Sequence, residues 1–466
     1  MRLFLLAVVI PLFLRGSEVT VDFARPKGKI RALQGVNNGP LCGASYIDLT
    51  TLHRDVGVSW NRLHDTPYQQ PDAVDIHCIF PDFRADPAQP ESYHFARTDE
   101  LLAAIALTGA RTIYRLGESI EHGPRKLFVH PPADFEKWAA ICAGIVAHYN
   151  EAWAGGARLG VTHWEIWNEP ENRPVMWSGS DDDYFRLYVT TARVLKARWP
   201  ELKVGGPAVG NTGEFKGGKF IPSEFLARFL DYCRAQNVPL DFLSCYADDP
   251  HDFSRRAHAI RQLLDERGFA KTESILDEWN WLPGEDWTPV SRDHPGPARD
   301  ALYDKIGGEG GAAFIACALA DLQDAPLDIA CFYTGDCQGF GLFTQHGTPK
   351  KSYQAFRAWR ALLDTPAQVL TTGGEPGQLS VCAGTNADKS EARVLVSHFR
   401  GEELKIPITM HGTPWPGGTV CEVLVINAAH DLEMVRRETF PGGDISLVLD
   451  LPASAVAVLK LAGVKR

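Results

Sequence analysis

The sequence predicts an α/β protein: a (β/α)₈ TIM barrel with an accessory antiparallel β-sandwich domain. Between residues 33 and 365, eight short apolar runs alternate with longer amphipathic stretches, the pattern of strand and helix units around a barrel. From residue 366 onward apolar and polar residues alternate with period two, and Gly, Pro and Asn turns separate the runs. The 466 residues, 45% of them hydrophobic, leave room for two to four domains.

The eight runs are the expected barrel strands. They are Gln34–Asn37, Val58–His64, Thr112–Leu116, Val161–Trp167, Leu202–Gly206, Leu240–Ser244, Ser274–Asp277 and Ile329–Tyr333. Between them lie helical patterns; in Phe135–Tyr149, for example, apolar residues recur at spacings of three and four. Ser180 followed by three Asp predicts a capped helix start. A doubly wound sheet is the alternative, but no GxGxxG follows the first run.

Four segments are expected along the chain: residues 1–17, 18–32, 33–365 and 366–466. The first is a possible signal peptide, because Leu3–Leu14 is apolar and follows Arg2. Pro11 interrupts this run and no small-x-small cleavage pattern follows, so a buried N-terminal strand or a mis-assigned start is the alternative. The second segment is a strand expected to join the sandwich, the third the barrel and the fourth the sandwich itself.

The location of the protein depends on the first segment. A signal peptide would make the protein secreted or periplasmic, and otherwise it would be cytoplasmic. No other segment reaches the ~18 uninterrupted apolar residues of a membrane helix, so no further membrane contact is expected.

Composition narrows the classes of ligand. Lys and Arg number 47 against 58 Asp and Glu, for a net charge of −11, and no stretch forms a basic patch, so nucleic acid is not an expected partner. A polyanionic substrate is disfavoured for the same reason, whereas 12 Trp and 12 Tyr suit sugars and other ring-shaped ligands. Oligomeric state is left open.

No metal or cofactor is expected. The ten cysteines form no CxxC pair or Cys/His cluster with zinc spacing. The Gly-rich segment Gly307–Gly311 lacks a following Lys-Ser/Thr, so we expect a loop rather than a phosphate-binding site. No GxSxG motif of a serine hydrolase follows a strand either.

Two glutamates are the candidate catalytic residues. Glu169, in Trp-Asn-Glu-Pro, ends the fourth expected strand, and Glu278, in Asp-Glu-Trp-Asn, ends the seventh. Strand ends meet at the C-terminal face of a barrel, where active sites of this fold are built. Cleavage of a glycosidic bond needs such a pair, one carboxyl to protonate the leaving oxygen and one to meet the oxocarbenium ion. Neighbouring tryptophans would desolvate a carboxyl and raise its pKa. A single Glu at a strand end is usually only solvated; the pairing favours catalysis.

At these motifs the chain resembles the clan of retaining glycoside hydrolases with catalytic glutamates on barrel strands four and seven. Within it the chain most resembles glycoside hydrolase family 39. Supporting segments are Arg62–Asp65, Tyr114–Ser119, Met176–Gly179 and Lys350–Phe356. The resemblance covers the barrel and extends to a sandwich assembled from both chain ends. The family contains β-D-xylosidases and α-L-iduronidases, and arabinosidases as well.

The resemblance implies roles for individual residues. Glu169 would be the general acid/base and Glu278 the nucleophile. Asn168 would hydrogen-bond the sugar 2-hydroxyl, Arg62 would hold Glu278 ionised, and His64 would lie near the sugar, although a lone His at a strand end is often purely structural.

Three aromatic residues complete the expected substrate site. Trp281 and Tyr333 would stack on the sugar or, more commonly for such residues, pack. Tyr246 stands where the family commonly has His, and tyrosine can hydrogen-bond but cannot become a cation. This departure leaves the sugar open.

The expected activity is therefore a retaining, exo-acting glycoside hydrolase that works by double displacement, β-D-xylosidase-like on plant-type oligosaccharides. Its partner is an oligosaccharide or glycoside substrate. Alternatives within the family are an arabinosidase or an α-L-iduronidase-like enzyme, which needs a cationic pocket that Arg115 could supply. From a different class, the chain could be a non-catalytic carbohydrate-binding protein.

Overall fold

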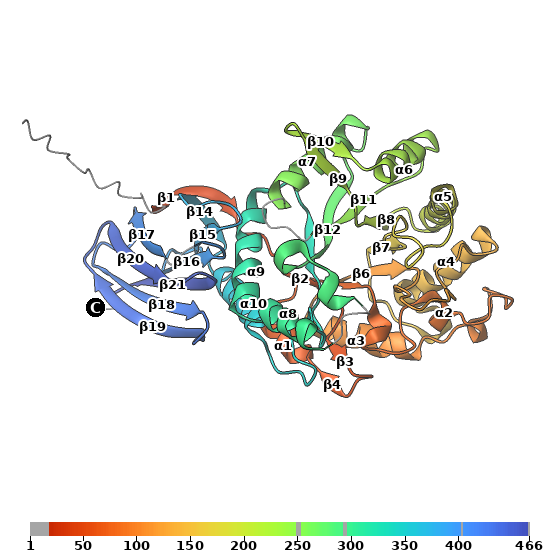
Figure 1. Cartoon of the computed structure of the whole chain (residues 1–466), viewed down its shortest axis with the longest axis horizontal. Coiled ribbons are helices and arrows are strands. Elements are labelled where there is room, and N and C mark those ends of the chain that lie inside the picture. The colour runs from red at the N-terminus through yellow and green to blue at the C-terminus, as the bar shows by residue number, and fades with distance from the viewer. Residues whose placement is uncertain (1–17, 248–252, 292–295, 402–403, 465–466) are drawn as a thin grey trace, which may run out of the picture.

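The structure, a computed structural model, describes residues 18–247, 253–291, 296–401 and 404–464. It consists of a barrel and a separate β-sheet domain that lie side by side (Figure 1). The expected signal peptide, residues 1–17, lies outside the described residues. No helix in the described ranges combines the length and apolar character needed to cross a bilayer.

The barrel prediction is confirmed. Eight parallel strands close in chain order, each beside the next, with the last pairing to the first. They are β2 (Gly35–Asn37), β5 (Trp60–Leu63), β6 (Arg111–Leu116), β7 (His163–Ile166), β8 (Lys203–Val209), β11 (Phe242–Ala247), β12 (Glu273–Trp279) and β13 (Ile329–Phe332). Every expected strand is one of these eight.

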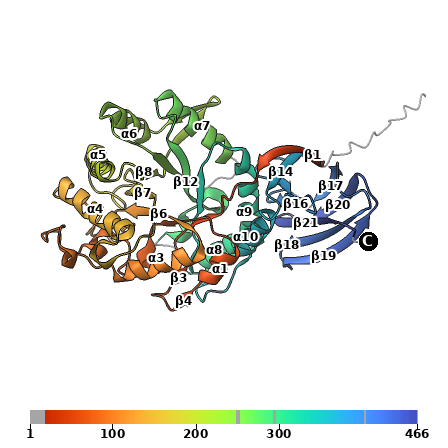
Figure 2. The ribbon, with the colours of Figure 1, turned by 180° about the vertical axis from the view of Figure 1, so that it is seen from behind.

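Helices surround the barrel on the outside (Figures 1 and 2). They are α1 (Thr50–Asp55), α2 (Ile76–Ile79), α3 (Ala96–Thr108), α4 (Phe135–Glu151), α5 (Asp181–Arg198), α6 (Glu224–Ala235), α7 (Phe253–Glu266), α8 (Pro297–Gly307), α9 (Glu309–Asp321) and α10 (Lys351–Leu362). The start of α5 is capped as predicted, because the Ser180 hydroxyl accepts from the Asp183 N–H and the Asp183 carboxylate accepts from the Ser180 N–H. Two small hairpins, β3 (Leu41–Cys42) with β4 (Ile47–Asp48) and β9 (Gly213–Lys216) with β10 (Lys219–Pro222), follow strands β2 and β8.

The inside of the barrel changes character along its axis. One apolar layer consists of Trp60, Ile113, Phe242, Ile275, Ile329 and Cys331. Two residues further along three of these strands stand Arg62, Arg115 and Asp277, all buried. Because strand side chains repeat with period two, these charged groups form the next layer towards the C-terminal ends. The apolar floor therefore supports a charged layer at the face where sites of this fold lie.

The accessory domain is a mostly antiparallel sheet, as predicted. Its order is β19-β18-β21-β16-β15-β14-β1-β17-β20. The strands are β1 (Val19–Lys29), β14 (Ala367–Thr372), β15 (Leu379–Thr385), β16 (Glu391–His398), β17 (Leu404–His411), β18 (Thr419–Ile426), β19 (Asp431–Phe440), β20 (Ile445–Leu451) and β21 (Ala455–Gly463). Strand β1 pairs antiparallel with β14 and parallel with β17, so the N-terminal strand joins this sheet. Apolar residues from both halves of the sheet form one shared core.

Helices α9 and α10 lie between the barrel and the sheet (Figures 1 and 2). The loop expected at Gly307–Gly311 is wrong, because Gly310 and Gly311 lie inside α9. A Cβ at Gly311 would stand 1.7 Å from the Ile306 carbonyl oxygen, and one at Gly310 would stand 2.6 Å from the Trp281 ring. These glycines permit close packing, and the helix is buried on all sides between two layers.

Candidate active site

The turn after β7 holds Asn168 and Glu169. Trp167 and Glu169 have φ values of +71° and +41°, a region that non-glycine residues rarely adopt and that is common at functional sites. The Trp167 N–H donates to the Leu116 carbonyl (2.8 Å), and the Glu169 N–H donates to the Ala208 carbonyl (3.2 Å). The turn is therefore tied to the two neighbouring strands, which fixes its side chains.

A β-bulge places two acidic residues at the end of β12. In its pairing with β11, Leu276 lies opposite Cys245 and Glu278 lies opposite Tyr246, so Asp277 is the extra residue. The pairing with β13 shifts at the same place. Adjacent residues of a regular strand point to opposite faces, but a bulge re-aims one of them. Asp277 and Glu278 consequently both reach the same guanidinium.

That guanidinium is Arg62, which is fully buried at the centre of the site. Its Nη1 donates to Glu278 Oε2 (3.4 Å) and its Nη2 donates to Asn168 Oδ1 (2.5 Å). Its Nε donates to Glu165 Oε2 (2.7 Å), and its Nη2 lies 3.1 Å from Asp277 Oδ2. Burial opposes the charge of Arg62, but these carboxylates outweigh it and raise its pKa. Arg62 thus joins the end of strand four to the end of strand seven.

The carboxyl group of Glu169 lies in a buried, acidic environment. Burial and the nearby carboxylate of Glu171 raise the pKa of Glu169 to about 7. Glu171 is fixed beside it, since its Oε1 accepts from the N–H groups of Gly210 (2.6 Å) and Asn211 (3.1 Å). Glu169 Oε2 itself accepts only a long bond from Asn172 (3.4 Å) within the described chain. These surroundings favour the protonated form of Glu169.

The carboxyl group of Glu278 interacts electrostatically with Glu169. Burial and the charge of Glu169 raise the pKa of Glu278, whereas the adjacent Arg62 guanidinium lowers it. Two like charges in one buried site cannot both form at low cost. Arg62 contacts Glu278, and no cation of the described chain contacts Glu169. The proton shared by the pair is therefore expected on Glu169.

His64, Asp65 and Tyr333 form one side of this group. The His64 Nε2 lies 3.8 Å from Glu278 Oε2 and 3.3 Å from Asp65 Oδ2. The Tyr333 hydroxyl donates to Asp65 Oδ2 (3.2 Å). Burial, Arg62 and Arg115 hold the pKa of His64 well below its usual range. His64 is therefore a neutral hydrogen-bonding group beside the carboxyl of Glu278.

Six of the eight predicted site residues are thus brought together: Glu169, Glu278, Asn168, Arg62, His64 and Tyr333. Trp281 is not among them, because its indole packs against Phe314 and Phe399 at the boundary with the sheet domain. This is the packing alternative considered for Trp281. The backbone of Tyr246 lies opposite Glu278 in the β11–β12 register, and its side chain lies outside the described residues.

Sequence reasoning missed Glu165, Asp277, Glu171 and Gly210. A signal was available for the first two, because a charged residue inside an otherwise apolar barrel strand must find a buried partner. For Glu171 and Gly210 no signal was available, since their proximity to Glu169 depends on how two loops meet.

A second polar group consists of Asp75 and His77 at the start of α2 and Glu118 just after β6. Oxygen and nitrogen atoms of Asp75, His77 and Glu118 lie within 4.8 Å of one another, as metal ligands would. Asp75 already accepts from Arg115 (2.5 Å) and Ser119, and Glu118 pairs with His77 (2.5 Å). The protein supplies a cation to each carboxylate, so this group is an ion-pair network.

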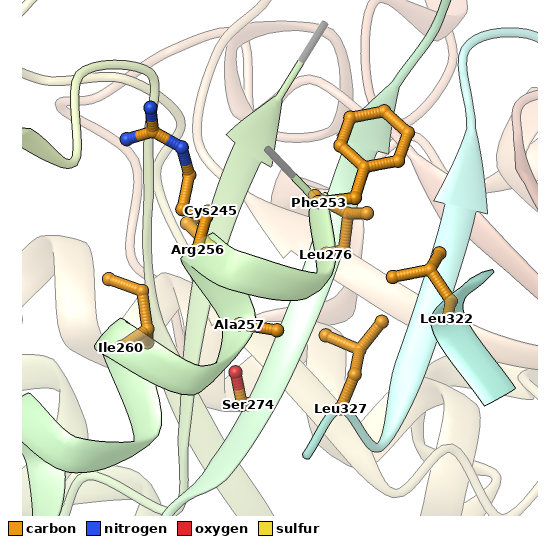
Figure 3. Close-up of a pocket in the computed structure, with 9 residues that line it drawn as sticks. All are labelled: Cys245, Phe253, Arg256, Ala257, Ile260, Ser274, Leu276, Leu322 and Leu327. Carbon is orange, nitrogen blue, oxygen red and sulfur yellow. The ribbon is translucent and has the colours of Figure 1, made fainter. Parts of the chain in front are cut away.

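A small apolar cavity lies elsewhere, between α7 and the strands β11 and β12 (Figure 3). Phe253, Leu276, Leu322 and Leu327 surround it, and no carboxylate is among its described lining residues. The described lining therefore does not make this cavity a candidate for the catalytic site.

Gly210 provides a test of the environment of Glu169. A Cβ at this position would stand 2.3 Å from Glu169 Oε1, so Gly210→Ala must displace the carboxyl group. If Glu169 is the predicted acid/base, we expect kcat/KM to fall by roughly a hundredfold, since small misplacements of a catalytic group have effects of that size. The matched control is Gly123→Ala, whose added Cβ would meet only a carbonyl oxygen at 3.6 Å. Equal kinetics of the two variants would show that Gly210 does not position Glu169.

Comparisons with known proteins indicate the family of the chain. The family model for glycosyl hydrolases family 39 matches residues 72–366. A β-xylosidase of Geobacillus stearothermophilus is 26% identical over 444 residues, covering 83% of this chain and 84% of the relative. A glucosidase from Croceicoccus marinus has a similar structure, with a TM-score of 0.78, 25% identity and coverage of 96% of this chain and 99% of that one. A monomeric β-xylosidase from Caulobacter crescentus shares the fold, with a TM-score of 0.71, 16% identity and coverage of 96% and 99%.

Proposed function

Since the chain belongs to glycosyl hydrolases family 39 and is a xylosidase-like glycoside hydrolase, we propose that it removes terminal β-D-xylosyl units with retention of configuration. Plant-type oligosaccharides are the proposed substrates. Glu169 is the proposed acid/base and Glu278 the proposed nucleophile. The observation that carries this proposal is the contact of one buried Arg62 with both Asn168 and Glu278, which joins the two strand ends.

In the first step Glu278 attacks the anomeric carbon while Glu169 protonates the departing glycosidic oxygen. Arg62 stabilises the carboxylate of Glu278, and the charge of Glu278 keeps the proton on Glu169. The Nδ2 of Asn168 is buried and has no partner among the described residues, so it can donate to the sugar 2-hydroxyl. That contact strengthens in the oxocarbenium-like transition state.

In the second step water cleaves the glycosyl ester. Once Glu278 is esterified its charge is gone, and Glu169 ionises more easily. Glu169 then removes the proton from water, which attacks from the face that the leaving group vacated. Two inversions give net retention, the outcome of carboxyl groups ~5–5.5 Å apart.

The structure weakens the α-L-iduronidase-like alternative. A uronic acid substrate needs a cation for its carboxylate, and Arg115 was the candidate. Its guanidinium is buried and donates to Asp75 (2.5 Å) and Ser119 (3.3 Å), so Asp75 already neutralises its charge. A non-catalytic carbohydrate-binding role would not explain the presence of Glu169 and Glu278 in the site. An arabinosidase remains chemically equivalent in mechanism.

A panel of nitrophenyl glycosides tests the proposal, combined with proton NMR of the first product released. We expect the highest kcat/KM on β-D-xyloside, above β-D-glucoside, α-L-arabinoside and α-L-iduronide, and β-xylose as the initial anomer. Preference for another glycoside would replace the proposed sugar but keep the mechanism. An initial α-anomer would contradict retention, and binding without any product would support the carbohydrate-binding role.

The pH profile follows from the environment of Glu169. The general acid must be protonated, and the pKa of Glu169 is raised to about 7, so kcat/KM should fall as the pH rises through about 7. The measurement is kcat/KM against pH on an alkyl or disaccharide substrate. With a dinitrophenyl glycoside, which departs without a proton, the alkaline decline should disappear. An alkaline decline of equal size on both substrates would show that it does not arise from Glu169.

A further inference from the structure

Three carboxyl groups surround the buried Arg62, and the proposed mechanism gives a role to only one of them, that of Glu278. Glu165, Asp277 and Glu278 all lie within 3.4 Å of its guanidinium. Glu165 and Asp277 are 0% and 1% exposed at the side chain, and Glu278 is 16% exposed. With every group ionised, this cluster would hold three negative charges against one positive charge. Burial makes such an imbalance costly, and it is relieved by binding a proton.

Hydrogen bonds show which carboxyl group is least stabilised as an anion. Glu165 accepts from Arg62 Nε (2.7 Å), and Glu278 accepts from Arg62 Nη1 (3.4 Å). Neither oxygen of Asp277 accepts a hydrogen bond from any other described residue, although both are buried. Its Oδ2 stands 3.1 Å from Nη2 outside hydrogen-bonding geometry. A buried carboxylate that no other residue supplies with a hydrogen bond is the least stabilised anion of the three.

We propose that Asp277 is a positioning residue whose carboxyl group stays protonated, so that the charge of Arg62 is left to Glu165 and to the nucleophile Glu278. This inference rests on the proposed function for its catalytic meaning. The bulge at the end of β12 lets Asp277 and Glu278, two consecutive residues, both contact Arg62.

The charged and titratable groups around Asp277 are consistent with this assignment. Burial raises the pKa of Asp277 well above the usual range, and the charges of Glu165 and Glu169 add to this effect, whereas Arg62 and the backbone N–H of Asp277 oppose it. The carboxyl group of Glu278 also interacts with Asp277, and two neighbouring negative charges oppose each other. From the neighbouring strands β11 and β13 come the thiols of Cys245 and Cys331, whose pKa values burial also raises, so they contribute no positive charge.

The charge balance explains why a neutral Asp277 suits catalysis. With Asp277 protonated, Arg62, Glu165 and Glu278 together carry one net negative charge, which complements the positive oxocarbenium ion. After Glu278 is esterified, the positive charge of Arg62 and the negative charge of Glu165 cancel. An ionised Asp277 would compete with Glu278 for Arg62 and leave a buried charge uncompensated in the glycosyl-enzyme.

Infrared spectroscopy tests the protonation state directly. The difference spectrum between the wild-type protein and Asp277→Asn at pH 7 should contain the carbonyl stretch of a protonated carboxylic acid, lost in the variant. Loss of a carboxylate band in its place would overturn the proposal. This measurement needs no turnover, so its result is independent of whether the proposed glycosidase activity is found.

The acid limb of the kcat/KM profile provides a second readout, with Glu165→Gln as the matched variant. Asp277→Asn removes no charge if Asp277 is protonated. The pH at which kcat/KM rises on the acid side should therefore stay the same, even if the maximal kcat/KM changes. Glu165→Gln removes the negative charge of Glu165 next to Arg62, so Glu278 becomes easier to ionise. The acid side of the kcat/KM profile should therefore move to lower pH by roughly one unit or more. Equal shifts in both variants would overturn the proposal. If Asp277→Asn fails to fold, Asp277→Thr, a neutral residue of similar size, serves in both measurements.

Discussion

Glu278→Ala is expected to lower kcat by roughly 10⁴–10⁶-fold, the range that loss of a covalent nucleophile produces. The Glu278 carboxylate, at the end of β12, accepts a hydrogen bond from Arg62 Nη1, whereas Glu165 accepts one from Arg62 Nε. Steady-state kinetics on the best nitrophenyl glycoside provide the measurement. The matched control is Glu91→Ala, an exposed acid elsewhere in the barrel, which should leave kcat unchanged.

Azide distinguishes loss of the nucleophile from general damage. Alanine leaves space for a small anion where the carboxylate stood, so azide should restore turnover and yield a glycosyl azide of inverted configuration. Recovery without azide, or an azide product of retained configuration, would show that Glu278 is not the attacking group.

Glu169→Ala is expected to show an effect that depends on the leaving group. General acid–base catalysis contributes about 10²–10⁴-fold, and we expect that loss on disaccharide substrates. A dinitrophenyl leaving group needs no proton, so its departure should remain close to the wild-type rate, and the glycosyl-enzyme should then accumulate because no base activates water. Rapid-mixing kinetics should reveal a burst followed by slow turnover.

Azide again supplies the discriminating product. It needs no base to attack the glycosyl-enzyme, so it should accelerate the slow phase of Glu169→Ala and give an azide of retained configuration. Equal loss on good and poor leaving groups would contradict the role of Glu169 as acid/base.

The sequence predicted the barrel because its strands and helices have distinct periods. The apolar runs are short and the amphipathic stretches between them are long, and eight such units have one common architecture. The prediction of a loop at Gly307–Gly311 was wrong, and the local sequence does not show why. Gly310 and Gly311 lie in a helix buried between two layers, and the Trp281 ring and the Ile306 carbonyl leave no room for larger side chains at these positions.

The proposed catalytic pair could be predicted from its position at two strand ends, but the residues that surround and position it could not. Glu169 and Glu278 end strands, and strand ends meet at one face. The bulge at Asp277 has no signature in the sequence, so the sequence does not indicate that two consecutive acids reach Arg62. The same holds for Gly210, whose approach to Glu169 depends on the loop after β8. For Trp281 the sequence left stacking and packing open, and the structure shows packing against Phe399 of the sheet domain, a contact that only the tertiary structure reveals.

The most direct test of the central claim is to trap the glycosyl-enzyme. A 2-deoxy-2-fluoro glycoside with an activated leaving group slows both steps but the second more, so the ester accumulates. We predict that the intact mass rises by one fluoroglycosyl unit and that peptide mapping locates the ester on Glu278. An ester on any other residue, or complete turnover of the natural glycoside through a product of inverted configuration with no ester formed, would contradict the account.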